Sequence, residues 1–207
     1  TLERKGISLN VASHIGAATA RMNLLASADA DPTRDQLGAI QDIVRRAMEE
    51  GALGVGSSLI YVPGTFAGTD ELVALAETAG RCGGIYATHM RSEGGQLLEA
   101  IDETIEIARR SGTPAEIWHF KAAGRENWLK LDQAVARIEA ARRSGLRITT
   151  DMYAYPAAST GLDAAMPPWV QEGGNAAWYA RLRDPSIRAR VAAEMRLEDA
   201  GWNNTLR

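Results

Sequence analysis

The stretch Gly84-Ile85-Tyr86-Ala87-Thr88-His89-Met90-Arg91 decides the fold. A short apolar run ends in a histidine, and a long amphipathic segment follows. The same arrangement recurs at Ala115-Glu116-Ile117-Trp118-His119. Such an alternation is typical of strands and helices that build a parallel sheet. Because the carboxyl ends of parallel strands share one edge, we expect both histidines at the edge where α/β barrels carry their active sites.

Further apolar runs extend this pattern in both directions. The sequence predicts strands at 7–11, 52–58, 85–88, 115–118 and 146–150, with helices between them, the clearest over 93–110. After a longer first unit, the strands start about thirty residues apart, the length of a strand, a helix and two short loops. About five βα units favour a partial (β/α)8 TIM-type barrel over an open, doubly wound sheet. No Gly-x-Gly-x-x-Gly motif follows any strand, which argues against dinucleotide binding.

The pattern changes beyond Pro156. Residues 157–174 lack a sustained period, and 176–197 is helical again with an interruption near Asp184-Pro185. We therefore expect residues 1–207 to form one domain, the central part of a barrel, in which 156–207 contain a long loop and a helical excursion. Because residue 1 is Thr and not Met, we also expect the chain to be an internal part of a longer protein.

The composition narrows the class of protein. The chain has 207 residues, of which 45% are hydrophobic and 24% charged, as in an ordinary globular protein. A formal net charge of −3 leaves no basic surface for nucleic acid. No apolar run approaches the ~18 residues that a membrane span needs. The single cysteine, Cys82, excludes an internal disulfide and predicts a cytoplasmic location, whereas the oligomeric state stays open.

His89 and His119 are the first candidates for chemistry. Equivalent positions on adjacent parallel strands lie about 5 Å apart. Two imidazoles at that distance, each with a reach of ~2.0–2.1 Å to zinc, can share one ion. The alternative is that each is a hydrogen-bonded histidine of the core or rim. Two ligands are also fewer than the three protein ligands that a catalytic zinc normally has.

Other polar residues follow the predicted strands. Lys121 could attract a substrate carboxylate or be a solvated lysine, and Arg91 has the same two interpretations. Asp151 could contact a substrate or fix a turn. Phenol groups of Tyr61 and Tyr153 could bind a small polar substrate or pack within their loops. Because no Gly-x-Ser-x-Gly elbow or Ser-His-Asp order is present, the chemistry rests on the histidines.

Several stretches, in this order and spacing, resemble the D-aminoacylases (N-acyl-D-amino-acid deacylases) of the amidohydrolase superfamily. The resemblance covers nearly the whole chain, and the motifs Ala-Thr-His-Met-Arg and Asp-x-Tyr-x-Tyr-Pro are specific when found together. The stretches are Asn10-Val11-Ala12-Ser13, Gly51-Ala52-Leu53-Gly54, Leu59-Ile60-Tyr61-Val62-Pro63-Gly64, Tyr86-Ala87-Thr88-His89-Met90-Arg91, His119-Phe120-Lys121 and Asp151-Met152-Tyr153-Ala154-Tyr155-Pro156.

The resemblance implies a metal-dependent hydrolase on a (β/α)8 barrel with one or two Zn²⁺ ions. Its reaction would cleave the amide bond of a small N-acyl-D-amino acid to give a carboxylate and a D-amino acid. By position, His89 and His119 match the family's metal-binding histidines. The residues that match its substrate-binding positions are Tyr61, Lys121, Tyr153 and Ser159.

The chain also departs from the family pattern. It has no His-x-His pair, and Cys82 and Asp151 are misplaced for the family's cysteine ligand and general acid/base aspartate. We therefore expect no catalytic residue within this chain, the aspartate C-terminal to residue 207, and no activity of these residues alone. Two alternatives stay open: a related amidohydrolase for another linear or cyclic amide, and a truncated, non-catalytic barrel used as a binding or assembly module.

Overall fold

The computed structural model describes residues 2–155 and 157–196 and contains one five-stranded parallel sheet. The strand order, β1-β2-β3-β4-β5, is the order of the sequence. A doubly wound sheet reverses its strand order at a switch point, and this sheet does not. The structure therefore confirms a partial barrel. The strands are β1 (Ile15–Gly16), β2 (Gly54–Ser58), β3 (Ile85–His89), β4 (Ala115–Ile117) and β5 (Ile148–Thr150).

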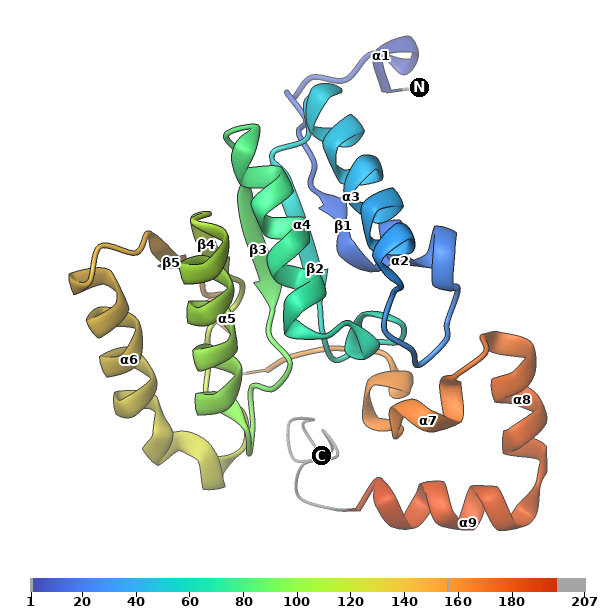
Figure 1. Cartoon of the computed structure of the whole chain (residues 1–207). Coiled ribbons are helices and arrows are strands. Elements are labelled where there is room, and N and C mark those ends of the chain that lie inside the picture. Colours follow the sequence, from blue (N-terminus) through green and yellow to red (C-terminus); the bar gives the residue numbers. More distant parts are fainter. Residues whose placement is uncertain (1, 156, 197–207) are drawn as a thin grey trace.

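Helices cover one face of the sheet, and α3 to α6 lie side by side along it (Figure 1). The main core lies between sheet and helices and includes Leu72, Tyr86 and Ile101, each at most 1% exposed. The helices are α1 (Leu2–Lys5), α2 (Ala17–Leu25), α3 (Arg34–Glu49), α4 (Thr69–Arg81), α5 (Leu97–Ser111) and α6 (Leu131–Arg143), with short 3-10 turns η1 (Gly64–Phe66) and η2 (Arg125–Lys130).

The C-terminal excursion lies beyond the carboxyl ends of the strands (Figure 1). It contains η3 (Leu162–Ala165), α7 (Pro168–Gln171), α8 (Asn175–Arg183) and α9 (Pro185–Glu194), with its own apolar cluster. The predicted interruption is real, because the carboxylate of Asp184 accepts hydrogen bonds from the backbone N–H groups of Ser186 and Ile187 and starts a new helix.

Pro156 and residues 197–207, parts of the predicted excursion, lie outside the described residues. That residues 1–207 form one domain remains a prediction. Within the described ranges, every helix is too short or too polar to cross a membrane.

Two predicted boundaries were wrong. The first strand is not 7–11, where Leu9 is 75% exposed, but Ile15–Gly16, which pairs with β2. A β-branched run alone does not make a strand without a neighbouring strand to bond. The helix predicted from Glu93 begins only at Leu97, because Gly94 and Gly95 follow and the Ser92 hydroxyl accepts the N–H of Gly94 at 3.2 Å. Glu93 therefore lies in a loop.

Candidate metal centre

His89 and His119 come together where strands β3 and β4 end. His89 is the last residue of β3, and His119 is two residues past the end of β4. Nδ1 of His89 lies 2.9 Å from Nε2 of His119, and the ring centroids are 4.5 Å apart. This N···N separation is close to the ~3.3 Å between two ligand atoms of one tetrahedral zinc ion. The donor set therefore fits half of such a site.

The backbone at His119 is turned out of the strand conformation. Its φ of 42° lies in the left-handed region, which residues other than glycine seldom adopt. The start of the loop after β5 holds this turn. A side-chain oxygen of Asp151 accepts the N–H of His119, and the Asp151 carbonyl accepts the N–H of Phe120 at 2.9 Å. Asp151 thus fixes a turn, the structural alternative considered for it.

Glu93 lies beside the two histidines, although the sequence predicted it to be part of a helix. Its Oε1 lies 2.7 Å from Nδ1 of His119 and 2.7 Å from Nζ of Lys121. Lys121 also donates to the carbonyl oxygen of His119 at 2.9 Å. Ligand atoms of His89, Glu93 and His119 all lie within 4.8 Å of one another. The signal that could have found Glu93 is the Gly94-Gly95 pair, which delays the helix.

Burial and charge set the protonation of this cluster. Burial lowers the pKa of His89 to about 4; the carboxylate of Glu93 opposes this shift, and the neighbouring His119 and Lys121 add to it. Burial alone would raise the pKa of Glu93, but hydrogen bonds from His119 and Lys121 outweigh it and lower that pKa. At neutral pH the site therefore presents a neutral His89, the form that binds metals, beside a carboxylate.

The four predicted substrate-binding residues lie at different distances from the two histidines. The rings of Tyr61 and His89 lie 5.7 Å apart, and Nζ of Lys121 lies 5.3 Å from the ring centre of Tyr153. Ser159 is exposed, and the next residue, Thr160, shares a 2.5 Å hydrogen bond with the Tyr61 hydroxyl. The structure brings Tyr61, Lys121 and Tyr153 to the histidine pair, whereas Ser159 lies in the loop that contacts Tyr61.

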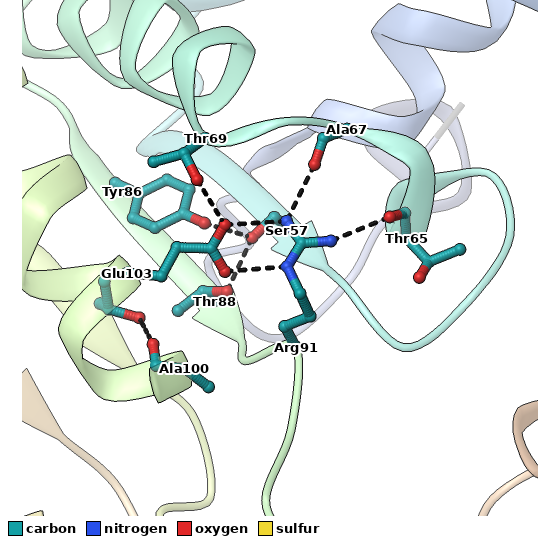
Figure 2. A network of polar contacts seen from close by, with 10 residues as sticks. Ser57, Thr65, Ala67, Thr69, Tyr86, Thr88, Arg91, Ala100 and Glu103 are labelled. Carbon is teal, nitrogen blue, oxygen red and sulfur yellow. Dashed lines mark hydrogen bonds and ion pairs between the residues drawn. The ribbon is translucent and has the colours of Figure 1, made fainter. Parts of the chain in front are cut away.

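Arg91 is neither solvated nor directed at a substrate carboxylate, because its guanidinium binds a loop (Figure 2). Its guanidinium donates to the carbonyl oxygens of Thr65 and Ala67 at 2.8 Å each and to both carboxylate oxygens of Glu103 at 2.9 Å. Thr69 donates to the same carboxylate at 2.8 Å. This network anchors the segment between β2 and α4, residues 59–68, which carries Tyr61.

The chain is similar in sequence to known enzymes. No protein-family model matches the sequence. N-acyl-D-glutamate deacylase of Alcaligenes xylosoxydans xylosoxydans is 33% identical over 159 residues, which cover 77% of this chain and 33% of the relative. The D-aminoacylase of the same organism is 33% identical over 155 residues, 75% of this chain and 32% of the relative. The chain belongs to the D-aminoacylase family.

Solved structures of the D-aminoacylase family share the fold. N-acyl-D-glutamate deacylase from Bordetella bronchiseptica, complexed with zinc and a phosphonate that mimics the tetrahedral intermediate, matches with a TM-score of 0.72 and 32% identity over 75% of this chain and 33% of that chain. A D-aminoacylase studied for its binuclear metal centre matches with a TM-score of 0.70 and 31% identity over 74% of this chain and 32% of that chain. This chain thus spans about a third of the length of its relatives.

Proposed function

We propose that this chain supplies two metal ligands and part of the substrate pocket for zinc-dependent hydrolysis of N-acyl-D-amino acids. The observation that carries the proposal is the pair of facing nitrogens, Nδ1 of His89 and Nε2 of His119, 2.9 Å apart beside Lys121. The relatives' names and the zinc in one related structure support the metal and the substrate class. One or two zinc ions are compatible with this role.

Zinc, when bound by His89 and His119, supplies a Lewis acid that polarises the amide carbonyl and lowers the pKa of water towards ~7. Around it, the chain's own residues bind and orient the substrate. The ammonium of Lys121 attracts the carboxylate of the N-acyl amino acid as a point charge. The hydroxyl group of Tyr61 is a hydrogen-bonding group for the same carboxylate, and Tyr153 and Ser159 line the substrate pocket.

No residue of this chain is assigned the general acid/base. Asp151 is committed to the backbone N–H of His119, so it holds a ligand in place and transfers no proton in this proposal. The proposal also includes a cytoplasmic location, which the single cysteine, Cys82, supports.

Zinc titration and a stereospecific assay test the proposal. Zinc binding, followed by competition with a chromophoric chelator, should weaken at least tenfold in His89→Asn and in His119→Asn. His14→Asn is the matched control, because this third histidine lies before β1 and packs against Trp118. Zinc affinity that survives the loss of both His89 and His119 contradicts the proposed centre.

The assay uses the intact protein that carries these residues. We expect it to release D-amino acids from N-acetyl-D-amino acids and to leave the L-isomers and cyclic amides uncut. Turnover of a cyclic amide alone would assign the chain to another amidohydrolase reaction. Zinc binding without any amide hydrolysis would favour the binding module.

A further inference from the structure

The carboxylate of Glu93 occupies one side of the His119 ring. It comes from the loop between β3 and α5, its side chain is 10% exposed, and its Oε1 lies 2.7 Å from Nδ1 of His119. The opposite ring nitrogen, Nε2, faces His89. The two nitrogens of an imidazole point away from each other, so Glu93 lies on the side of His119 that is remote from the shared ligand position.

This geometry separates two roles that the cluster of His89, Glu93 and His119 allows. A third metal ligand would converge with Nδ1 of His89 and Nε2 of His119 on a common point. The Glu93 oxygen is instead within hydrogen-bond distance of Nδ1 of His119. A carboxylate that accepts the second N–H of a ligating histidine fixes the ring's tautomer and orientation, and makes the ligand a better electron donor.

Nδ1 of His119 has two neighbours, because Nζ of Lys121 lies 3.1 Å from it and Oε1 of Glu93 lies 2.7 Å from it. These contacts allow two positions of the ring proton. If Nδ1 of His119 carries the proton and donates it to Glu93, Nε2 is free to accept from Nδ1–H of His89 across 2.9 Å. Nζ of Lys121 lies 2.7 Å from the same Oε1 of Glu93, next to the His119 ring. With the opposite tautomer, Nδ1 of His119 accepts from Lys121 and Nε2 carries the proton at the ligand position. Only the first tautomer leaves the lone pair of Nε2 free for a metal.

We propose that Glu93 is a positioning residue that holds His119 in the tautomer whose Nε2 binds the metal. The proposal rests on the metal centre of the proposed function and adds a residue that neither the sequence pattern nor the relatives' names assign. Glu93 touches neither the substrate nor the ion in this role. It acts through His119, and Nζ of Lys121 lies 2.7 Å from the same carboxylate.

Zinc alone is the probe for the first test. We expect the zinc affinity of Glu93→Gln to fall about 10- to 100-fold. The control is Glu99→Gln, an equal change of charge at an exposed position six residues away, which should keep the wild-type affinity. Equal zinc affinities for wild type and Glu93→Gln, with both proteins folded by circular dichroism, overturn the proposal.

A second measurement needs no metal and so separates this proposal from the proposed function. In ¹⁵N-histidine-labelled, metal-free protein, NMR should show His119 as the Nδ1–H tautomer, and Glu93→Ala should remove that preference. An Nε2–H tautomer of His119 in the wild type overturns the role of Glu93, whether or not zinc binds. If the tautomer is as proposed and zinc does not bind, the metal centre fails while the orienting role of Glu93 stands.

Discussion

At the scale of single residues, the site depends on one strained backbone position. His119 adopts φ 42° just after a strand, a conformation that costs on the order of 1 kcal/mol for a residue other than glycine. Asp151 and Lys121 hold it, one from the N–H side and one from the carbonyl side. This turn places the imidazole of His119 next to that of His89, with the ring centroids 4.5 Å apart.

We expect Asp151→Ala to lower the free energy of unfolding by about 1 kcal/mol, because the N–H of His119 loses its acceptor at a solvent-accessible site. Zinc affinity should fall as well, since the turn that presents Nε2 of His119 is no longer held. Urea denaturation and zinc titration measure the two effects. Asp151→Asn is the matched control, because its amide oxygen can still accept the bond; a loss as large as in Asp151→Ala would show that charge, and not the hydrogen bond, is what matters.

The lowered pKa of His89 predicts a pH-dependent stability of the metal-free protein. Between the ordinary value of 6.5 and the folded value of about 4, the unfolded chain binds a proton that the folded chain does not. Stability is therefore highest above pH 6.5 and falls as the pH drops towards 4, by on the order of 3 kcal/mol from this group. Urea titrations at several pH values measure it.

The comparison with His89→Asn isolates this effect. Burial also lowers the pKa of His14, so the wild-type slope contains a second contribution of the same sign. In His89→Asn the contributions of His14 and of carboxyl groups with shifted pKa values, such as Glu93, remain, and the slope between pH 6.5 and 4 should be shallower. Parallel pH profiles for the two proteins would mean that His89 is not desolvated.

At the scale of elements, the loops after the strands decide which side chains reach the site. The segment 59–68 carries Tyr61 and is anchored by Arg91, which joins two of its carbonyl groups to Glu103 on α5. Arg91 thereby ties the β2–α4 loop to the helix that follows β3. The planar guanidinium is suited to this, because it donates in several fixed directions at once.

We expect Arg91→Lys to lower the free energy of unfolding by about 1–3 kcal/mol, because the three donors of an ammonium cannot replace the four hydrogen bonds of the guanidinium to Thr65, Ala67 and Glu103, whose side chain is 14% exposed. Hydrogen exchange in residues 59–68 should accelerate, and urea denaturation gives the free energy. Arg109→Lys, in an exposed pair with Glu106, should change stability by less than about 0.5 kcal/mol. Unchanged exchange in 59–68 would show that the loop is held without Arg91.

The sequence predicted those elements whose apolar period continues along the chain. Strands β2 to β5 and helices α3 to α6 lie at or near the predicted ranges, because buried stripes such as Leu97, Ile101 and Ile105 repeat at helical spacing. The first strand was misplaced, since pairing depends on a neighbouring strand. Glu93 and the role of Arg91 escaped prediction, because both depend on contacts between segments that are separated in the sequence.

At the scale of the whole molecule, a ligand that binds only the folded chain stabilises all of it. If zinc binds at His89 and His119, a concentration 100 times the dissociation constant adds about 2.7 kcal/mol to the free energy of unfolding. We expect the melting temperature to rise with zinc and to return after chelation with EDTA. His119→Asn should abolish this shift. A shift of equal size in that variant would place the zinc elsewhere.

The strand order has a consequence for how the chain is made. Each strand pairs with the one synthesised just before it, so every new βα unit docks on an edge that is already complete. A chain leaving the ribosome can build this sheet from its amino end without waiting for distant residues. The histidine pair is different: His89 is placed early, whereas His119 is held only once Asp151 has emerged. The proposed metal centre is therefore among the last parts of residues 15–151 to mature during synthesis.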